Sequence, residues 1–179
     1  MYVGEPRVKC AFAAAMLLSL AGFAGAAAGA AHPSDLITQT SIGGATLGGT
    51  ARDYARVLGS PDFTTTMPGA LVRLTFAHGE LQVFLRGGRG VAILTPSDKL
   101  RTAQGAGPCV ETSQLKRLYG RRLVGHKRAH QPNVVAVSVG NLVFATPSRK
   151  VAAVLLARTP AKYLALLLNS SACGGGEEE

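Results

Sequence analysis

The chain has 179 residues, with 19 Lys and Arg against 10 Asp and Glu, and its formal net charge is +9 at neutral pH. This length allows one ordinary domain or two small ones and excludes a larger array of domains within these residues. The positive charge favours anionic partners such as wall polymers, lipid headgroups or nucleic acid, without choosing among them. The bias toward Ala, Gly, Arg and Leu is also a common product of GC-rich coding, which requires no selected binding role.

Residues 1–30 have the pattern of a secretory signal peptide. Arg7 and Lys9 precede a long apolar run, and a small-residue cleavage motif ends at Ala30. We expect cleavage after Ala30, export to the cell envelope or extracellular space, and no transmembrane span in the mature chain. The alternative is a retained membrane anchor, because the run approaches spanning length. A lipoprotein anchor would need a cysteine at the end of the run, whereas Cys10 lies at its start.

Export also bears on the remaining cysteines, Cys109 and Cys173. In an oxidising compartment two such cysteines normally form a disulfide bond. This bond would close a loop of more than sixty residues and stabilise the protein by about 4 kcal/mol on the chain-entropy estimate. The alternative is two free thiols.

An outline of about fourteen residues occurs twice, as TLGGTARDYARVLG in Thr46–Gly59 and as GPCVETSQLKRLYG in Gly107–Gly120. The two stretches are 61 residues apart, so that Tyr54 corresponds to Leu115. Each contains a glycine-bearing lead-in and a short amphipathic helix that ends at glycine, and each is followed by hairpin-like sequence. This arrangement predicts an internal repeat.

The first helix has the clearest local signals in the chain. Thr50 precedes Asp53 by three residues, a capping-box arrangement with Asp in place of Glu. Gly59 permits the left-handed conformation that ends a helix, and Pro61 prevents its continuation. The expected apolar stripe consists of Tyr54, Val57 and Leu58.

Three strands are predicted after this helix. Leu71–Phe76 and Leu81–Leu85 alternate apolar and polar residues, and Val91–Thr95 supplies the third strand. Turns at His78-Gly79 and Gly87–Gly90 join them into an antiparallel meander.

The second copy has a predicted helix at Glu111–Tyr119, whose N-terminal cap is less clear because Glu111 replaces Thr50. A basic, loop-like insertion is expected at Gly125–Asn133. Three strands then follow at Val135–Val139, Leu142–Ala145 and Val151–Ala157, the first two joined by a Gly-Asn turn.

A closing helix is predicted from Thr159-Pro160, with Thr as the N-cap and Pro at the first helical position. Packing on the sheet is the favoured interpretation, and lying on a membrane is the alternative. We therefore expect an α+β protein of two helix-plus-antiparallel-meander repeats, with the helices packed on one sheet face. Its segments are a signal peptide (1–30), a polar entry segment (31–41), repeat 1 with a helix and three strands (42–104), repeat 2 with a helix and three strands (105–158), a closing helix (159–169) and a flexible acidic tail (170–179).

Part of the sequence resembles a family of secreted, mostly actinobacterial proteins that consist of tandem helix-plus-strand repeats and have no assigned activity. The residues that carry this resemblance are Leu47-Gly48, Thr50, Val57-Leu58-Gly59, Pro61 and Arg101–Gly105, the join between the two copies. The layout is also similar to that of the β-lactamase inhibitor protein and the SmpA/OmlA-type outer-membrane lipoproteins. The resemblance covers about Ile42–Ala157 and implies helices packed on one face of an antiparallel sheet. Pro108-Cys109 departs from the pattern, which has Leu-Gly or Val-Gly there, and neither inhibition nor barrel assembly transfers to named residues.

The sequence contains no serine-hydrolase elbow and no phosphate loop. His126 and His130 would share one face of a helix, but Lys127 and Arg128 lie between them and no third ligand is near in sequence, so we expect no metal and no cofactor. Carboxylate pairs for acid–base catalysis are poorly supplied. We expect no enzyme activity, with a cryptic hydrolase as the open alternative.

Residues 31–176 carry 17 basic and 6 acidic side chains, a net charge of +11. The densest basic region is a candidate anion-binding site, and a solvated charged face is the alternative. We expect no nucleic-acid partner, because only one aromatic residue lies among these charges and the protein is expected to be exported. The candidate residues are Lys116, Arg117, Arg121, Arg122, Lys127 and Arg128.

The leading functional expectation is a non-catalytic binding or structural module of the envelope or extracellular space that binds a protein through its sheet face. The second is a basic surface protein that contacts wall polymer or lipid headgroups through residues 116–128.

Overall fold

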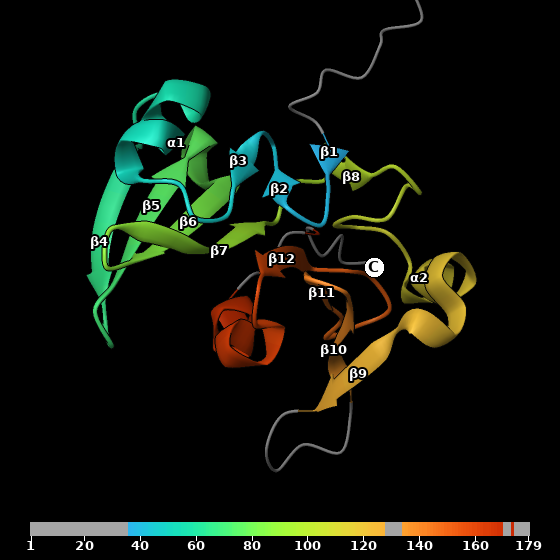
Figure 1. The fold of residues 1–179 in the computed structure, drawn as a ribbon. Helices are drawn as coiled ribbons and strands as arrows, with labels where there is room; N and C mark the ends of the chain where they lie inside the picture. Colours follow the sequence, from blue (N-terminus) through green and yellow to red (C-terminus); the bar gives the residue numbers. More distant parts are fainter. Residues whose placement is uncertain (1–35, 128–133, 170–172, 174–179) are drawn as a thin grey trace, which may run out of the picture. The chain divides into compact units, whose positions relative to one another are not determined.

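Eight antiparallel strands form the main sheet of the protein (Figure 1). The structure is a computed structural model that describes residues 36–127, 134–169 and 173. The predicted signal peptide, most of the basic insertion and nearly all of the acidic tail lie outside these residues. In spatial order the strands are β4 (Phe63–Met67), β5 (Leu71–Phe76), β6 (Leu81–Arg86), β7 (Arg89–Thr95), β12 (Ala153–Ala157), β11 (Leu142–Ala145), β10 (Val134–Val139) and β9 (Val124–Lys127).

The centre of this sheet is formed by strands far apart in sequence. β7 pairs with β12 in antiparallel register, with Leu94 opposite Leu155. Outward from that pair, β6, β5 and β4 follow on one side and β11, β10 and β9 on the other, each paired with its neighbour in sequence. Two-residue connections join β6 to β7 and β10 to β11. The predicted Gly-Asn turn is confirmed, whereas the turn predicted at Gly87–Gly90 is shorter, because Arg89 and Gly90 belong to β7.

The main sheet takes four strands from the residues that follow each α-helix, where three were expected. The additional strands, β4 and β9, are the two edges of the sheet. β4 has the sequence FTTTM, and four of its five residues are exposed, so it lacks the alternating pattern of a half-buried strand. β9 overlaps the start of the basic loop predicted at Gly125–Asn133, and its pairing with β10 supplies the hydrogen bonds that make it a strand.

A second sheet has four short strands, of which three precede the first helix and one follows it. Its order is β3 (Ala45–Thr46), β2 (Ser41–Ile42), β1 (Leu36–Ile37) and β8 (Arg101–Thr102). β1 runs parallel to β8, with Ile37 opposite Thr102. The end of the predicted polar entry segment is thus paired backbone, and Ile37 is 2% exposed.

Helix α1 (Ala51–Leu58) has the local structure that its sequence predicts. The Thr50 backbone N–H and hydroxyl both donate to Asp53, at 2.9 and 2.8 Å, and the Asp53 N–H donates to the Thr50 hydroxyl at 3.3 Å. Gly59 ends the helix with φ of 85°. The predicted stripe is partly wrong: Tyr54 is 2% exposed, but Val57 is 58% exposed, because a two-turn helix meets the core through a narrow face.

Helix α2 (Thr112–Tyr119) is exactly as long as α1, eight residues, and ends at Gly120. Its N-cap, Glu111, makes no side-chain capping bond. The buried residues Leu115 and Tyr119 join the same hydrophobic cluster as Tyr54, together with Leu74, Val83, Ile93, Phe144 and Leu156 from the main sheet. Both α-helices therefore pack on one face of that sheet.

The closing helix packs on the opposite face, which corrects the expectation that all helices share one face. Residues Pro160–Asn169 form the 3₁₀-helix η4, and Tyr163 and Leu167 are buried against a cluster that includes Phe84, Leu94 and Leu155. Alternation along the strands explains the two clusters, since Leu155 and Leu156 point to opposite faces. Two shorter 3₁₀-helices are η2 (Ala77–Gly79) and η3 (Gly120–Arg122).

Candidate anion-binding site

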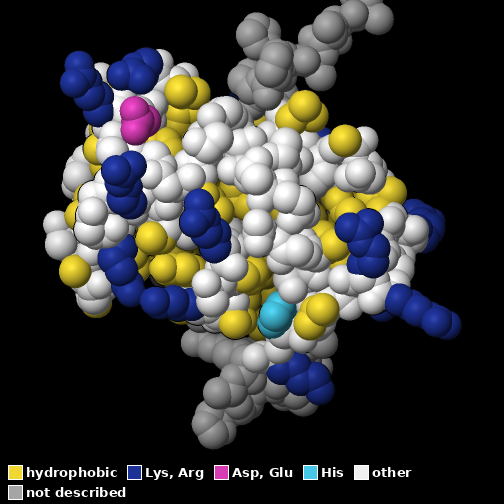
Figure 2. Space-filling view, in the orientation of Figure 1, with side chains coloured by type: hydrophobic (Ala, Val, Ile, Leu, Met, Phe, Trp, Pro, Cys, Tyr) yellow, Lys and Arg dark blue, Asp and Glu magenta, His cyan; other side chains and the backbone are white. Residues whose placement is uncertain are grey.

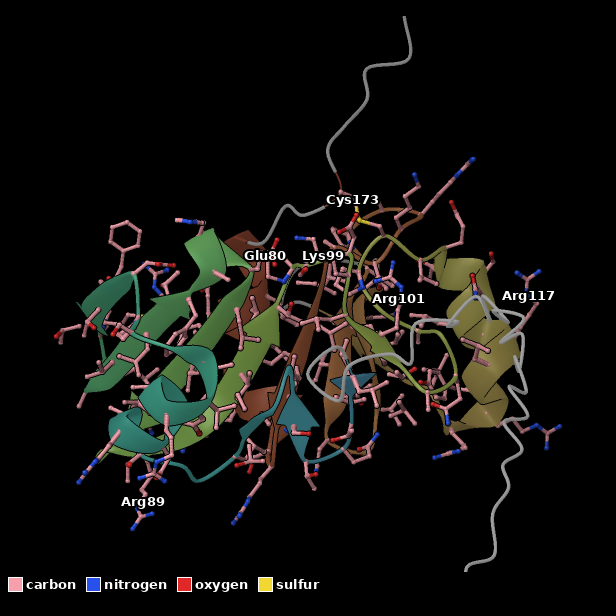
Figure 3. All side chains as sticks on the ribbon, turned by 90° about the horizontal axis from the view of Figure 1, so that it is seen from above. Glu80, Arg89, Lys99, Arg101, Arg117 and Cys173 are labelled. Atoms are coloured by element: carbon pink, nitrogen blue, oxygen red, sulfur yellow. A yellow bond between two sulfur atoms is a disulfide. The ribbon has the colours of Figure 1, made fainter. Side chains whose placement is uncertain are left out.

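The predicted basic residues lie along α2, η3 and β9. Lys116 and Arg117 are in the last turn of α2, Arg121 and Arg122 form η3, and Lys127 ends β9. All five are exposed, and in Figure 3 Arg117 projects outward from α2. Cations near a helix C-terminus interact favourably with the helix dipole, which is a structural reason for two of these charges. Arg128 lies outside the described residues.

None of these five charges is neutralised by a carboxylate in the part of the chain that the structure describes. The ion pairs there join Arg56 to Asp53 at 3.7 Å and Lys99 to Glu80 at 2.8 Å, both away from α2. The second pair can be followed in Figure 3. Figure 2 shows Lys and Arg side chains spread over one face of the molecule, with acidic side chains scarce. The positive charge therefore faces solvent.

A groove of about 550 Å³ lies beside α2. Leu115, Leu123 and Val137 supply its apolar lining, and Lys116 contributes a cation. Its remaining lining is small or polar, from Thr112, Gly120, Gly125, Thr146 and Ser148. The groove thus combines an apolar floor with one charged rim residue.

One end of this groove is held by backbone bonds. The N–H of Thr112 donates to the Arg149 carbonyl at 2.7 Å, and Glu111 forms an isolated antiparallel bridge with Lys150. The first turn of α2 is therefore tied to the loop between β11 and β12. This tie positions Lys116 one turn further along the helix.

Arg122 lines a different hollow, of about 250 Å³, which shares no lining residue with the groove. Its neighbours there include Gln104 and Tyr119, whose hydroxyl lies 3.1 Å from the Thr102 hydroxyl. The structure therefore does not gather the predicted residues into one cluster. Lys116 faces the groove, Arg122 faces the smaller hollow, and Arg117 and Arg121 line neither.

Two further arginines, Arg89 and Arg158, lie together in a third hollow of about 400 Å³. Sequence reasoning did not select them, because they are 69 residues apart and neither belongs to a charge run. Only the β7–β12 pairing brings their segments together. No local pattern could have found this pair.

The predicted disulfide between Cys109 and Cys173 is present, with the two Cα atoms 5.4 Å apart. It links residues 64 positions apart and ties Cys173 to the lead-in of α2. Cys109 has φ of 65°, a left-handed conformation that is costly for a side chain with a Cβ atom.

His126 lies on strand β9, where its Nε2 is 2.8 Å from the Ser138 hydroxyl. A helical His126–His130 pair is therefore not formed at this end, and His130 is outside the described residues. Among the residues described, no three His, Cys, Asp or Glu side chains gather as metal ligands. Asp53 acts as a cap, and the Thr50 backbone N–H, followed by the Thr50 hydroxyl, holds the pKa of its carboxyl below the usual 3.8.

No helix in the described ranges is long and apolar enough to cross a membrane. Comparison of the chain with protein-family models, with curated proteins and with solved structures found no match.

Proposed function

We propose that this protein is a non-catalytic binding protein of the cell envelope that engages anionic lipid headgroups through the groove beside α2. The groove carries the proposal, because an apolar floor of Leu123 and Val137 adjoins the cation of Lys116. Arg117, Arg121 and Lys127 lie on the same elements and are exposed. The phosphate of a lipid headgroup would interact with these charges, while the apolar part of the lipid contacts the floor of the groove.

Val124 is 58% exposed on the edge strand β9, but it alternates with Gly125 of the groove, so its side chain points to the other face of the sheet and is not part of this site. The expected export of the chain and the disulfide, which is typical of oxidising compartments, support an envelope location.

Protein binding through the sheet face is less well supported. The α-helices and the smaller sheet pack on one face of the main sheet, and η4 packs on the other. The large hydrophobic side chains that remain exposed in the described residues, Val57, Phe63 and Val124, come from three different elements. Scattered apolar residues do not form the contiguous patch that a protein-binding face exposes.

We also infer that the two halves are copies of one unit, an inference that an offset of 61 residues supports. α1 and α2 have equivalent bounds at this offset, and β4 and β9 begin at equivalent residues. The backbone bonds from Gly48 to Gly90 and from Gly90 to Gly49 recur from Cys109 to Val151 and from Val151 to Val110. Residues with positive φ recur as Gly44 and Gly105, Gly48 and Cys109, Gly59 and Gly120, and Gly79 and Gly140.

The test is vesicle co-sedimentation of the mature protein with phosphatidylglycerol and, separately, phosphatidylcholine vesicles. We expect binding to phosphatidylglycerol alone, with a steep loss as salt rises. Lys116→Gln with Arg117→Gln should weaken this binding by about thirtyfold, since each basic residue near an anionic surface contributes about 1 kcal/mol. Arg52→Gln with Arg86→Gln is the matched control, because it removes the same charge from exposed sites on other elements.

Equal losses in both double variants would show that net charge alone drives binding and would contradict a site beside α2. Binding to soluble polyphosphate but not to vesicles would indicate that the partner is a wall polymer and not a lipid. Binding that does not change with salt concentration would contradict the proposal that charge attracts the protein to the headgroups.

A further inference from the structure

The hollow that contains Arg89 and Arg158 is formed where three segments meet. Gly48 belongs to the lead-in of α1, Arg89 and Val91 to the start of β7, and Arg158, Thr159 and Tyr163 to the end of β12 and η4. Its volume is about 400 Å³, enough for a small organic molecule. It is separate from the groove beside α2 and shares no lining residue with it.

Both guanidinium groups reach the same glycine. Nη1 of Arg89 donates to the Gly48 carbonyl oxygen at 3.3 Å. Nη2 of Arg158 lies 3.9 Å from the position that a Cβ atom on Gly48 would occupy. Figure 3 shows Arg89 pointing outward beside α1, so its guanidinium is open to solvent. Two cations that border the same hollow favour an anion within it.

The described residues supply no carboxylate to this pair, since neither arginine takes part in an ion pair there. Asp53 is close enough for the charge of Arg89 to contribute to its lowered pKa, but only as the last of several causes. Its Oδ2 already accepts from the Thr50 backbone and hydroxyl, and its Oδ1 lies 3.7 Å from Arg56. The capping carboxylate is therefore engaged elsewhere.

The equivalent place in the second half of the chain shows why the hollow exists. The Gly48 N–H donates to the Gly90 carbonyl in β7 at 2.8 Å, and the Cys109 N–H donates to the Val151 carbonyl, two residues before β12, at 2.7 Å. Cys109 carries a side chain there, and its sulfur is bonded to Cys173. Gly48 has none, so the space above it remains open, and Arg158 lies beside it.

We propose that Arg89 and Arg158 form a binding site for a small organic oxyanion, a carboxylate or phosphate monoester. Two guanidinium forks match the paired oxygens of such groups and bind them by charge-assisted hydrogen bonds. The Thr159 hydroxyl offers a further donor, and Val91 and Tyr163 provide an apolar wall for the carbon skeleton. This site goes beyond the headgroup-binding proposal and does not depend on it.

The experiment is calorimetric titration of the mature protein with phenyl phosphate, benzoate and benzyl alcohol. Phenyl phosphate and benzoate separate the two oxyanion classes, and benzyl alcohol reports apolar contact alone. We expect binding of at least one oxyanion and none of the alcohol. Arg89→Gln with Arg158→Gln should weaken oxyanion binding by about tenfold or more, the loss expected from removing charge-assisted hydrogen bonds.

Two further variants make the result specific. Arg158→Lys retains the charge and loses the fork, so it should weaken binding nearly as much as Arg158→Gln. Arg86→Gln with Arg149→Gln, exposed arginines outside the hollow, should leave binding unchanged. No binding of either oxyanion, equal losses in the two double variants, or full retention by Arg158→Lys would each overturn the proposal. Lys116→Gln with Arg117→Gln affects vesicle binding alone, so the two sites can fail separately.

Discussion

Tyr54 and Leu115 occupy the same position, the fourth residue of an eight-residue helix, and both are buried, with 2% and 0% exposure. A Cβ atom on Gly90 would overlap the Tyr54 hydroxyl, whereas the residue 61 positions after Gly90 is Val151, which is fully buried in the same hydrophobic cluster as Leu115. The tyrosine hydroxyl also donates to the Thr46 carbonyl at 2.6 Å. The proposed repeat thus relates a large and a small residue in the first half, Tyr54 and Gly90, to two residues of intermediate size in the second, Leu115 and Val151.

This complementarity predicts coupling between Tyr54 and Gly90. Gly90→Val alone should lower the free energy of unfolding by about 3 kcal/mol, because the new side chain has no space. Tyr54→Leu with Gly90→Val reproduces the second half and should be more stable than Gly90→Val alone. Urea unfolding of the wild type, both single variants and the double variant measures the coupling. Additive effects would show that the two side chains do not share the space.

The capping box of α1 should contribute to stability in a pH-dependent way. Thr50→Ala should lower the free energy of unfolding by about 1 kcal/mol near neutral pH. The lowered pKa of Asp53 means that its contribution is present above the unfolded value of 3.8 and is lost as pH falls below it. The difference between wild type and Thr50→Ala should therefore shrink in acid. Glu111→Ala, at an N-cap without a side-chain bond, should cost less than half as much.

Burial should make Tyr54 resist ionisation. Desolvation raises the pKa of its hydroxyl above the usual 10.0. The unfolded chain therefore loses this proton first, so the contribution is complete below pH 10.0 and is lost as pH rises through the folded-state pKa. Ultraviolet titration should show one tyrosine ionising late, and Tyr54→Phe should remove it. A titration unchanged by that substitution would contradict the assignment.

The disulfide should stabilise the protein while holding a strained residue. Cys109→Ser with Cys173→Ser should lower the free energy of unfolding by about 4 kcal/mol. Cys109→Gly with Cys173→Ser should be about 1 kcal/mol more stable than that variant, because Cys109 has φ of 65°, which glycine adopts readily. Chemical denaturation of the two double variants, neither of which can form the disulfide, measures the difference in their free energies of unfolding. A serine variant as stable as the glycine variant would show that Cys109 relaxes once the bond is removed.

Local sequence signals predicted the elements that depend on residues close along the chain. The Thr50–Asp53 box and Gly59 indicated the bounds of α1, and Gly87–Gly90 and Gly140-Asn141 indicated the positions of two turns. The edge strands β4 and β9 were missed, because their sequences lack an alternating pattern. The 61-residue offset is the one signal that relates them to each other, since Phe63 and Val124 begin the two strands.

The sequence by itself determined caps, turns, most strands and the disulfide partners, because these depend on interactions within a few residues or on the number of cysteines. The tertiary structure alone decided that β7 pairs with β12, that η4 covers the opposite face, and that Arg89 meets Arg158. Such contacts join residues about seventy positions apart. They depend on which hydrophobic surfaces bury one another, and the conformational preferences of short segments do not determine that.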